Sequence, residues 1–184
     1  LGDGLNLVTL PGMVTAVVAT SFALAQRDIQ RALSLSIVGQ LGYAVAALGL
    51  GAFAAGILHL VVTIVVAALL FLAAGSVIRG MTSAQPAEPS QTPLDPQDML
   101  EMGGLRRRQK DTFVMFLIGA LTLGGLPFVT AGFWSRDAIL AQASNVSQAA
   151  FWLLALSLTL TAFSAMRQIC LIFAGPSRSP AAAQ

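Results

Sequence analysis

The stretch FAAGILHLVVTIVVAALLFLAAGSVI, from Phe53 to Ile78, decides the fold of this chain. It contains one ionisable side chain, His59, and is otherwise almost entirely aliphatic. An α-helix needs about 20 consecutive apolar residues to cross a hydrocarbon core of about 30 Å. The stretch is therefore predicted to span a membrane.

Four further apolar runs lie on either side of this stretch. They are Val8–Gln26, Ala32–Leu50, Thr112–Ser144 and Ala149–Ala174. The composition agrees, because 56% of the residues are hydrophobic, 10% are charged and the mean hydropathy is +0.79, whereas a soluble domain carries about 25% charged residues. We expect an all-α fold, a polytopic bundle of about five transmembrane crossings.

The fourth run is too long for one straight crossing and contains a break. Gly124–Pro127 and Ala131-Gly132 interrupt the helical pattern, and the remaining Trp134–Ser144 is too short to span alone. One discontinuous crossing made of two half-helices fits both lengths. Irregular backbone is tolerated in a membrane only where protein or a water-filled cavity satisfies it, and in transporters it marks ion or substrate sites.

Composition divides the chain into four parts. Residues 1–79 hold three predicted spans, residues 80–111 form a flexible loop with a basic end, residues 112–175 hold the discontinuous helix and the last helix, and residues 176–184 are a tail. The polar stretch Thr82–Pro93 contains three prolines and cannot bury enough apolar surface to order itself. The sequence opens at Leu1 without the features of a signal peptide, so we expect a fragment or a chain whose first residues are missing.

Five crossings place most of the positive charge on one side. Eight of the ten Lys and Arg residues lie in the 26–31 turn, the 79–111 loop or the tail, while Arg136 and Arg167 lie within predicted spans. This excess predicts that the basic side is cytoplasmic. The run Arg106–Lys110 could suggest nucleic acid, but beside a span an orientation signal or a contact with anionic lipid is favoured.

Ionisable groups inside a span are costly and are therefore functional candidates. His59 is one, with a hydrogen bond to a neighbouring helix or a position near the membrane interface as the alternative interpretation. Arg136 and Asp137 stand where the broken helix restarts, either as a buried ion pair facing a hydrated cavity or as a structural pair that caps the half-helix. Arg167 is a further candidate, although its side chain can extend to the headgroups. Asp28 is most simply part of an interfacial charge cluster.

The sequence lacks the motifs of soluble enzymes. It has no Gly-rich phosphate loop followed by lysine, no pair of histidines in a metal-ligand pattern and no nucleophile elbow. Its one cysteine, Cys170, excludes a disulfide framework or a zinc cluster built on cysteines. We expect no cofactor and no metal, and in particular no site for NADH, flavin or an iron–sulfur cluster in this chain.

Short segments along almost the whole chain form a recognisable set. They are Ala25–Arg31 (AQRDIQR), Gln40–Tyr43 (QLGY), His59-Leu60, Ala68–Ile78 (ALLFLAAGSVI), Met102–Leu105 (MGGL), Gly125–Pro127 (GLP), Thr130–Asp137 (TAGFWSRD), and Thr161–Phe163 (TAF) with Arg167. Together, from about residue 12 to residue 175, they resemble the antiporter-like membrane subunits of respiratory complex I, of the subunit L (chain 5) kind. The related Mrp cation/proton antiporter subunits are the next most similar.

This resemblance implies which part of the family's fold the chain contains. The family core has two inverted five-helix repeats, and this sequence is similar to the second, whose fourth helix is discontinuous. The first repeat, with its membrane glutamate and lysine, is not in the sequence. Both a truncated sequence and a split subunit are compatible with this observation.

The chain departs from the family at its titratable positions. Gln30 stands where the family has a lysine, and the His, His, Lys ladder of the third helix, which shares one face at i, i+4 and i+8, reads His59, Thr63 and Ala67. Arg136 replaces a lysine, and arginine stays protonated where a buried lysine can lose its proton. We therefore predict that this half-channel is impaired or inactive. The candidates for a proton or ion pathway are His59, Thr63, Gln30, Arg136, Asp137 and Arg167.

The sequence thus favours a membrane-arm component of a complex I-like NADH:quinone oxidoreductase, in a bacterial-type inner membrane. Its expected partners are other membrane subunits and the lipid bilayer, with no nucleic acid. The alternatives are a subunit of a Mrp-type cation/proton antiporter or of a membrane-bound hydrogenase, or a structural or assembly subunit that does not pump.

Overall fold

The computed structural model describes residues 7–83, 95–126, 130–176 and 178, which fold into a helical bundle. Its elements are α1 (Thr9–Ala25), α2 (Ile29–Gly49), α3 (Phe53–Ser83), a short 3-10 helix η1 (Leu105–Arg107), α4 (Lys110–Gly124), α5 (Ala131–Val146) and α6 (Gln148–Phe173). The expected all-α fold is confirmed.

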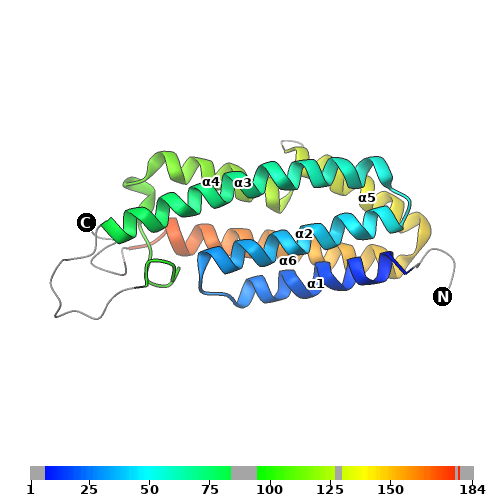
Figure 1. The fold of residues 1–184 in the computed structure, drawn as a ribbon, viewed down its shortest axis with the longest axis horizontal. Coiled ribbons are helices and arrows are strands. Elements are labelled where there is room, and N and C mark those ends of the chain that lie inside the picture. The colour runs from blue at the N-terminus through cyan, green and yellow to red at the C-terminus, as the bar shows by residue number, and fades with distance from the viewer. Residues whose placement is uncertain (1–6, 84–94, 127–129, 177, 179–184) are drawn as a thin grey trace.

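Successive helices run back and forth along the long axis of the bundle (Figure 1). Helices α1, α3 and α6 run toward the end that carries the C-terminus, and α2 runs the opposite way. Helices α4 and α5 follow one another in the direction of α2 and together cover the length of the bundle. They form one crossing in two pieces, as expected, so the bundle has five crossings.

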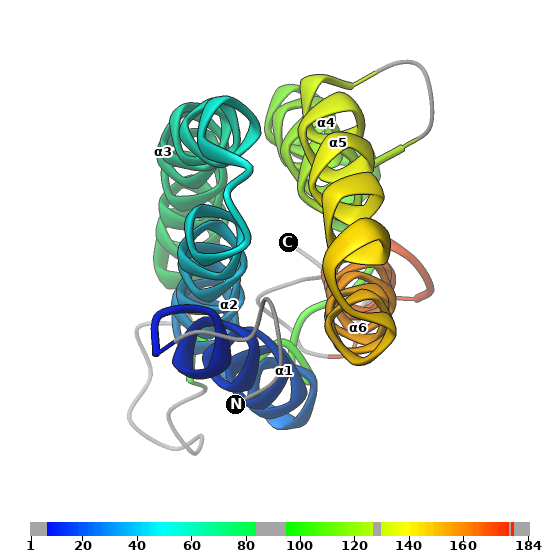
Figure 2. The ribbon, with the colours of Figure 1, turned by 90° about the vertical axis from the view of Figure 1, so that its right-hand side faces the viewer.

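The five crossings form a closed ring when viewed along this axis (Figure 2). Helix α1 packs on α2, α2 on α3, α3 on both α4 and α5, and these two on α6, which returns to α1. A ring of this kind has a common interior. Polar side chains that point inward from different crossings can therefore meet there.

The lengths and surfaces of the helices fit a membrane. Helices α2, α3 and α6 are long and apolar enough to span one, and α1 is a shorter apolar helix of 17 residues, the lower limit of the usual range. Large apolar side chains on the outside of the bundle are exposed, for example Ile64 at 65% and Leu72 at 74%. A soluble monomer rarely exposes apolar patches of this extent, so the chain is an integral membrane protein.

Three helix boundaries differ from the expected ones. Helix α5 begins at Ala131 and not at Trp134, so Ala131 and Gly132 lie in its first turn and not in the interruption. Helix α2 begins at Ile29 and not at Ala32, because the Asp28 carboxylate accepts hydrogen bonds from the backbone N–H groups of Gln30 (2.8 Å) and Arg31 (3.1 Å). The expected charge cluster is thus a helix N-cap, with Arg31 3.4 Å from the same carboxylate. Helix α3 continues five residues beyond its expected end and stops at Ser83.

The second half of the expected loop is packed against the bundle. The backbone of 97–99 pairs with the α1–α2 turn, where the Ile29 N–H donates to the Gln97 carbonyl (3.1 Å) and the Met99 N–H donates to the Arg27 carbonyl (2.9 Å). Met99 and Met102 are fully buried in the same hydrophobic core as the ends of α2, α3 and α6. The basic end of the loop is therefore held in place. Residues 84–94 lie outside the described residues, and their flexibility stays a prediction.

Helices α1 and α2 are in backbone contact along a seam of glycines, which we call the glycine seam: Gly12 on α1 with Gly39, Gly42 and Gly49 on α2. A Cβ atom at Gly12 would lie 2.5 Å from the Ala46 backbone nitrogen, and one at Gly42 would lie 2.7 Å from the Ala16 backbone nitrogen. Small residues allow such close approach between membrane helices, which strengthens their van der Waals packing.

Candidate functional site

The break in the fourth crossing has a definite geometry at both of its ends. Helix α4 ends at Gly124, and the next residue, Gly125, adopts the left-handed conformation (φ +73°) that glycine accepts without strain. Helix α5 begins after Thr130, whose backbone is extended. Pro127, part of the expected interruption, lies outside the described residues. The N–H groups of Gly125 and Leu126 donate to the Thr122 (3.2 Å) and Leu121 (3.0 Å) carbonyls, and the carbonyls that follow need donors from elsewhere.

Arg136 supplies these donors from the second turn of α5. Its guanidinium points back at the end of α4, where Nη1 donates to the Thr122 carbonyl (3.5 Å) and Nη2 donates to the Leu123 carbonyl. The side chain is 3% exposed. A positive charge at the C-terminal end of a helix is favourable because the helix dipole is negative there. Arg136 therefore joins the two half-helices across the break.

Two further helices reach Arg136 through a short chain of hydrogen bonds. Nη2 of Arg136 also donates to Oε1 of Gln40 on α2 (2.6 Å), and Nε2 of Gln40 donates to Oγ1 of Thr161 on α6 (3.1 Å). The Thr161 hydroxyl in turn donates to the Ser157 carbonyl (2.9 Å). Gln40 and Thr161 are each 1% exposed. The break is thus bonded to α2 and α6 through the interior of the ring.

Ser135, the residue before Arg136, connects the start of α5 to α3. Oγ of Ser135 lies 3.1 Å from Nδ1 of His59, which is 1% exposed. The His59 ring also lies against the Tyr43 ring of α2, with centroids 5.2 Å apart. Thr63 is buried one turn further along α3. We call Gln40, Tyr43, His59, Ser135, Arg136 and Thr161 the polar junction.

Several polar atoms around the junction lack a protein partner. Among the described residues these are Oη of Tyr43, Nε2 of His59, Nε of Arg136 and Oγ of Ser157, all buried. Buried polar atoms are almost always hydrogen-bonded, and ordered water supplies the partner where protein does not. The atoms come from α2, α3, α5 and α6, so the interior of the ring is a place where bound water is physically favoured.

The other candidates from the sequence lie apart from the junction. Gln30 is exposed in the first turn of α2, at the end of the bundle. Asp137 is exposed and makes no ion pair with its neighbour Arg136, so the buried-pair interpretation is wrong. Arg167 is half-buried on α6 and donates from Nη1 to the Gln26 carbonyl (2.9 Å), the C-cap of α1. Of the six candidates, the junction therefore contains His59 and Arg136, with Thr63 next to it.

Sequence reasoning missed several residues of the junction. Gln40 and Tyr43 drew attention only as part of a motif, and Ser135 only as a neighbour of Arg136. Their signal is a polar side chain in the middle of an apolar run, which is unfavourable unless it is bonded inside the protein. No group of three or more His, Cys, Asp or Glu side chains that could hold a metal ion occurs within the described part of the chain.

Comparison with known proteins shows which family this sequence is similar to. A family model described as "NADH:quinone oxidoreductase/Mrp antiporter, TM" matches residues 3–164. Subunit 5 of the chloroplast NAD(P)H-quinone oxidoreductase of Zygnema circumcarinatum is 41% identical over 174 residues, and chain 5 of the Synechocystis sp. enzyme is 38% identical over 174 residues. Each alignment covers 95% of this chain but only 24% and 25% of the relatives. The chain therefore spans about a quarter of their length.

A solved structure shows the same fold. A chain in the structure of the Mrp complex from Dietzia sp. DQ12-45-1b matches with a TM-score of 0.79 and 23% sequence identity, over 93% of this chain and 30% of that one. The five-crossing bundle with its interrupted fourth crossing is thus one part of a larger membrane fold. Because the family model covers most of its residues and the fold agrees, this chain belongs to the NADH:quinone oxidoreductase/Mrp antiporter transmembrane family.

Proposed function

We propose that this chain is part of an antiporter-like subunit in the membrane arm of a complex I-type NAD(P)H:quinone oxidoreductase. The proposal is supported by the identity of 38–41% to chain 5 proteins of such enzymes. Its partners are then the other membrane subunits of that assembly. The basic end of the bundle, where the α1–α2 turn, the 95–109 segment and the end of α6 gather, faces the cytoplasm of a bacterial-type inner membrane.

Within this role, the polar junction is the remnant of a proton path whose own conduction is impaired or absent. One observation carries this proposal: the guanidinium of Arg136 is bonded to two carbonyls of α4 and to Gln40. By the motif resemblance, Arg136 stands at a position of a family lysine. Arginine does not release its proton in proteins, so Arg136 is a fixed charge that holds the break together. His59 is followed along its helix face by Thr63 and Ala67, neither of which titrates.

Affinity purification tests the assignment to an assembly. The full chain carrying an affinity tag, extracted from its native membrane in mild detergent, should bring down subunits that oxidise NAD(P)H and reduce quinone. Recovery of cation-antiporter subunits with no NAD(P)H oxidation would assign the chain to the Mrp branch of the family. Recovery of hydrogenase subunits would contradict both assignments.

Proton pumping tests the impaired path. The purified assembly is reconstituted in vesicles, and NAD(P)H-driven acidification is compared between the native protein and His59→Ala. We expect the ratio of protons pumped to NAD(P)H oxidised to change by less than about twofold, since a single titratable group cannot relay protons without others in reach. A sharp fall in this ratio, with the assembly intact and oxidation preserved, would show that the junction conducts.

A further inference from the structure

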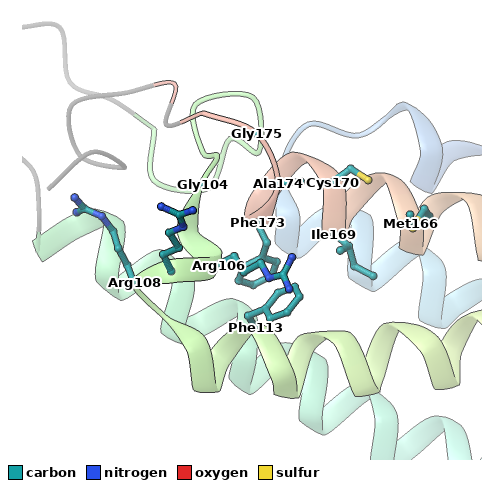
Figure 3. A pocket seen from close by; sticks show the side chains of 11 residues that line it. Gly104, Arg106, Arg108, Phe113, Met166, Ile169, Cys170, Phe173, Ala174 and Gly175 are labelled. Carbon is teal, nitrogen blue, oxygen red and sulfur yellow. The ribbon is translucent and has the colours of Figure 1, made fainter.

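A hollow at the basic end of the bundle is separate from the polar junction. It lies between the 104–108 segment, the start of α4 and the end of α6, and its volume is about 690 Å³. Arg106, Arg107 and Arg108 line one side of it, and none of the described residues that line it is acidic. Figure 3 shows Arg106 and Arg108 on the loop side and Met166 and Ile169 of α6 on the other. We call this hollow the arginine pocket.

The segment that carries the arginines is held by its neighbours. Leu105 is buried in the core, and the preceding Gly103 and Gly104 take positive φ angles that turn the chain. The guanidinium carbon of Arg106 lies 5.1 Å from the centre of the Phe113 ring on α4, a cation–π contact visible in Figure 3. The Arg106 guanidinium is therefore held at the mouth of the pocket, and Arg107 and Arg108 follow it on the same folded segment.

The opposite wall of the pocket is apolar and continues along the bundle. Met166 and Ile169 of α6 line the arginine pocket and also a second hollow of about 230 Å³ between α4 and α6. This second hollow reaches Ala162 on α6 and Gly124 at the break, and its lining is apolar. The two together form a groove with a basic mouth and an apolar floor.

The length of this groove matches one leaflet of a bilayer. From Phe173 to Ala162 the groove follows α6 over about 17 Å, at 1.5 Å per residue. Half of a hydrocarbon core of about 30 Å is about 15 Å. A soluble phosphate would use only the mouth, whereas an acyl chain beneath a phosphate uses the mouth and the floor together.

We propose that this groove binds one anionic phospholipid, with its phosphate at the three arginines and an acyl chain between α4 and α6. The charge of the mouth, the apolar floor and the leaflet-deep length all fit this ligand. The site does not rest on the proposed function, because none of its residues belongs to the polar junction. It would anchor the loop segment and the end of α4 to the lipid of one leaflet.

Native mass spectrometry of the purified full chain tests the site directly. The chain is delipidated and titrated with phosphatidylglycerol or with phosphatidylcholine, and bound lipid is counted. Each arginine near an anionic headgroup strengthens binding about fivefold. The triple variant Arg106→Gln, Arg107→Gln, Arg108→Gln should therefore lower the preference for phosphatidylglycerol by at least about tenfold.

Three other exposed arginines at the same end provide a matched control. Arg27, Arg31 and Arg79 do not line the arginine pocket. The triple variant Arg27→Gln, Arg31→Gln, Arg79→Gln changes the net charge equally and should keep the tight lipid. Equal loss in both triple variants would mean that only the general charge of this end attracts lipid, and would overturn the proposal.

The apolar floor is tested separately, without any change of charge. Ala162 lines the floor and is exposed, so Ala162→Phe fills the groove from its outer side. This variant should weaken binding of phosphatidylglycerol but leave binding of glycerol phosphate, a headgroup without chains, unchanged. If glycerol phosphate competes as well as the lipid does, the mouth binds free phosphate and the lipid assignment is wrong.

Cys170 allows the same question to be asked in a bilayer. It is the only cysteine in the sequence, is exposed, and lines the arginine pocket. A small fluorophore on Cys170 of the full chain in nanodiscs should be quenched more by brominated phosphatidylglycerol than by brominated phosphatidylcholine at equal mole fraction. This excess should vanish in the Arg106, Arg107, Arg108 variant, and its persistence there would contradict the site. Circular dichroism and gel filtration verify that each variant is folded.

Discussion

The glycine seam and the polar junction join helices of the same bundle in opposite ways. In the seam, α1 and α2 approach until the Ala46 and Ala16 backbones occupy the space of a side chain. In the junction, side chains of α5 bond to α2, α3 and α4, and Gln40 of α2 continues the chain of bonds to α6. Both lie within the membrane-spanning part of the chain, where apolar burial alone gives helices little reason to associate.

These two kinds of contact indicate where a membrane bundle is rigid and where it can hold water. Close backbone packing leaves no room for a solvent molecule and depends on shape alone. Polar bonding leaves some atoms without partners, here on Tyr43, His59, Arg136 and Ser157, and these favour bound water. We therefore expect the seam to respond to added volume and the junction to respond to removed hydrogen bonds.

The largest effect should come from filling the seam. Gly12→Leu places a side chain against the Ala46 backbone nitrogen and the Gly42 carbonyl, which cannot move without displacing a helix. We expect unfolding in mixed detergent micelles titrated with SDS to become easier by about 3 kcal/mol or more. Gly75→Leu is the control, since no atom lies within 4 Å of a Cβ atom there. Leucine also favours a helix more than glycine does, so an equal loss in the control would mean that the loss does not come from packing in the seam.

Removing the central arginine should produce the next largest effect. Arg136→Met leaves the Leu123 carbonyl and Oε1 of Gln40 without their donor, while the Thr122 carbonyl keeps the bond from the Gly125 N–H. Each buried polar group without a partner costs about 1–3 kcal/mol, partly offset because a buried charge is also removed. We expect a net loss of about 2–4 kcal/mol in the free energy of unfolding, measured in the same SDS titration.

Arg167 offers the matched control for Arg136. It makes the same type of bond, from a guanidinium to a carbonyl at the C-terminal end of a helix, but it is half-buried at the end of the bundle. Water can replace it there, so Arg167→Met should cost less than about 1 kcal/mol. Equal losses of stability in the two variants would mean that burial of the junction does not strengthen the bonds of Arg136.

Gln40 tests whether the junction extends beyond Arg136. Gln40→Leu removes both the acceptor of Arg136 and the donor to Thr161, and should cost about 1–3 kcal/mol. Gln142→Leu removes a single bond to the Leu50 carbonyl near the opposite end (3.2 Å), and should cost less than about 1 kcal/mol. A smaller loss for Gln40→Leu than for Gln142→Leu would contradict a junction centred on Arg136.

The same contrast explains what the sequence could predict. The spans and the break follow from local features, namely long apolar runs and the Gly-Gly-Leu-Pro interruption, which determine hydropathy and helix length without knowledge of neighbours. The partners of Arg136 do not follow from local features, because Gln40 lies 96 residues away in the sequence. The glycine seam was missed for a related reason, since a glycine in a helix reveals its role only when the facing helix is known.

The loop shows the limit of reasoning from composition. Its polar, proline-containing part predicted flexibility for the whole of 80–111, but Met99 and Met102 anchor the second half in the core. The apolar side chains of these two methionines indicated burial, but the many charged residues around them made the average composition of the loop polar. The expected ion pair of Asp137 with Arg136 was wrong for a different reason. Adjacent residues on a helix point in different directions, so the two side chains do not face each other.

The smallest expected change in stability is that of Ser157→Ala, which tests whether the polar junction contains bound water. Oγ of Ser157 is buried and has no partner among the described residues. If water bonds this hydroxyl, Ser157→Ala loses one bond, the water adjusts, and stability should change by less than about 0.5 kcal/mol. If the site is dry, the native serine carries an unsatisfied buried group, and the alanine variant should be more stable by about 1–3 kcal/mol. We expect the first result in the SDS titration, and the second would place the junction with the seam as a dry contact.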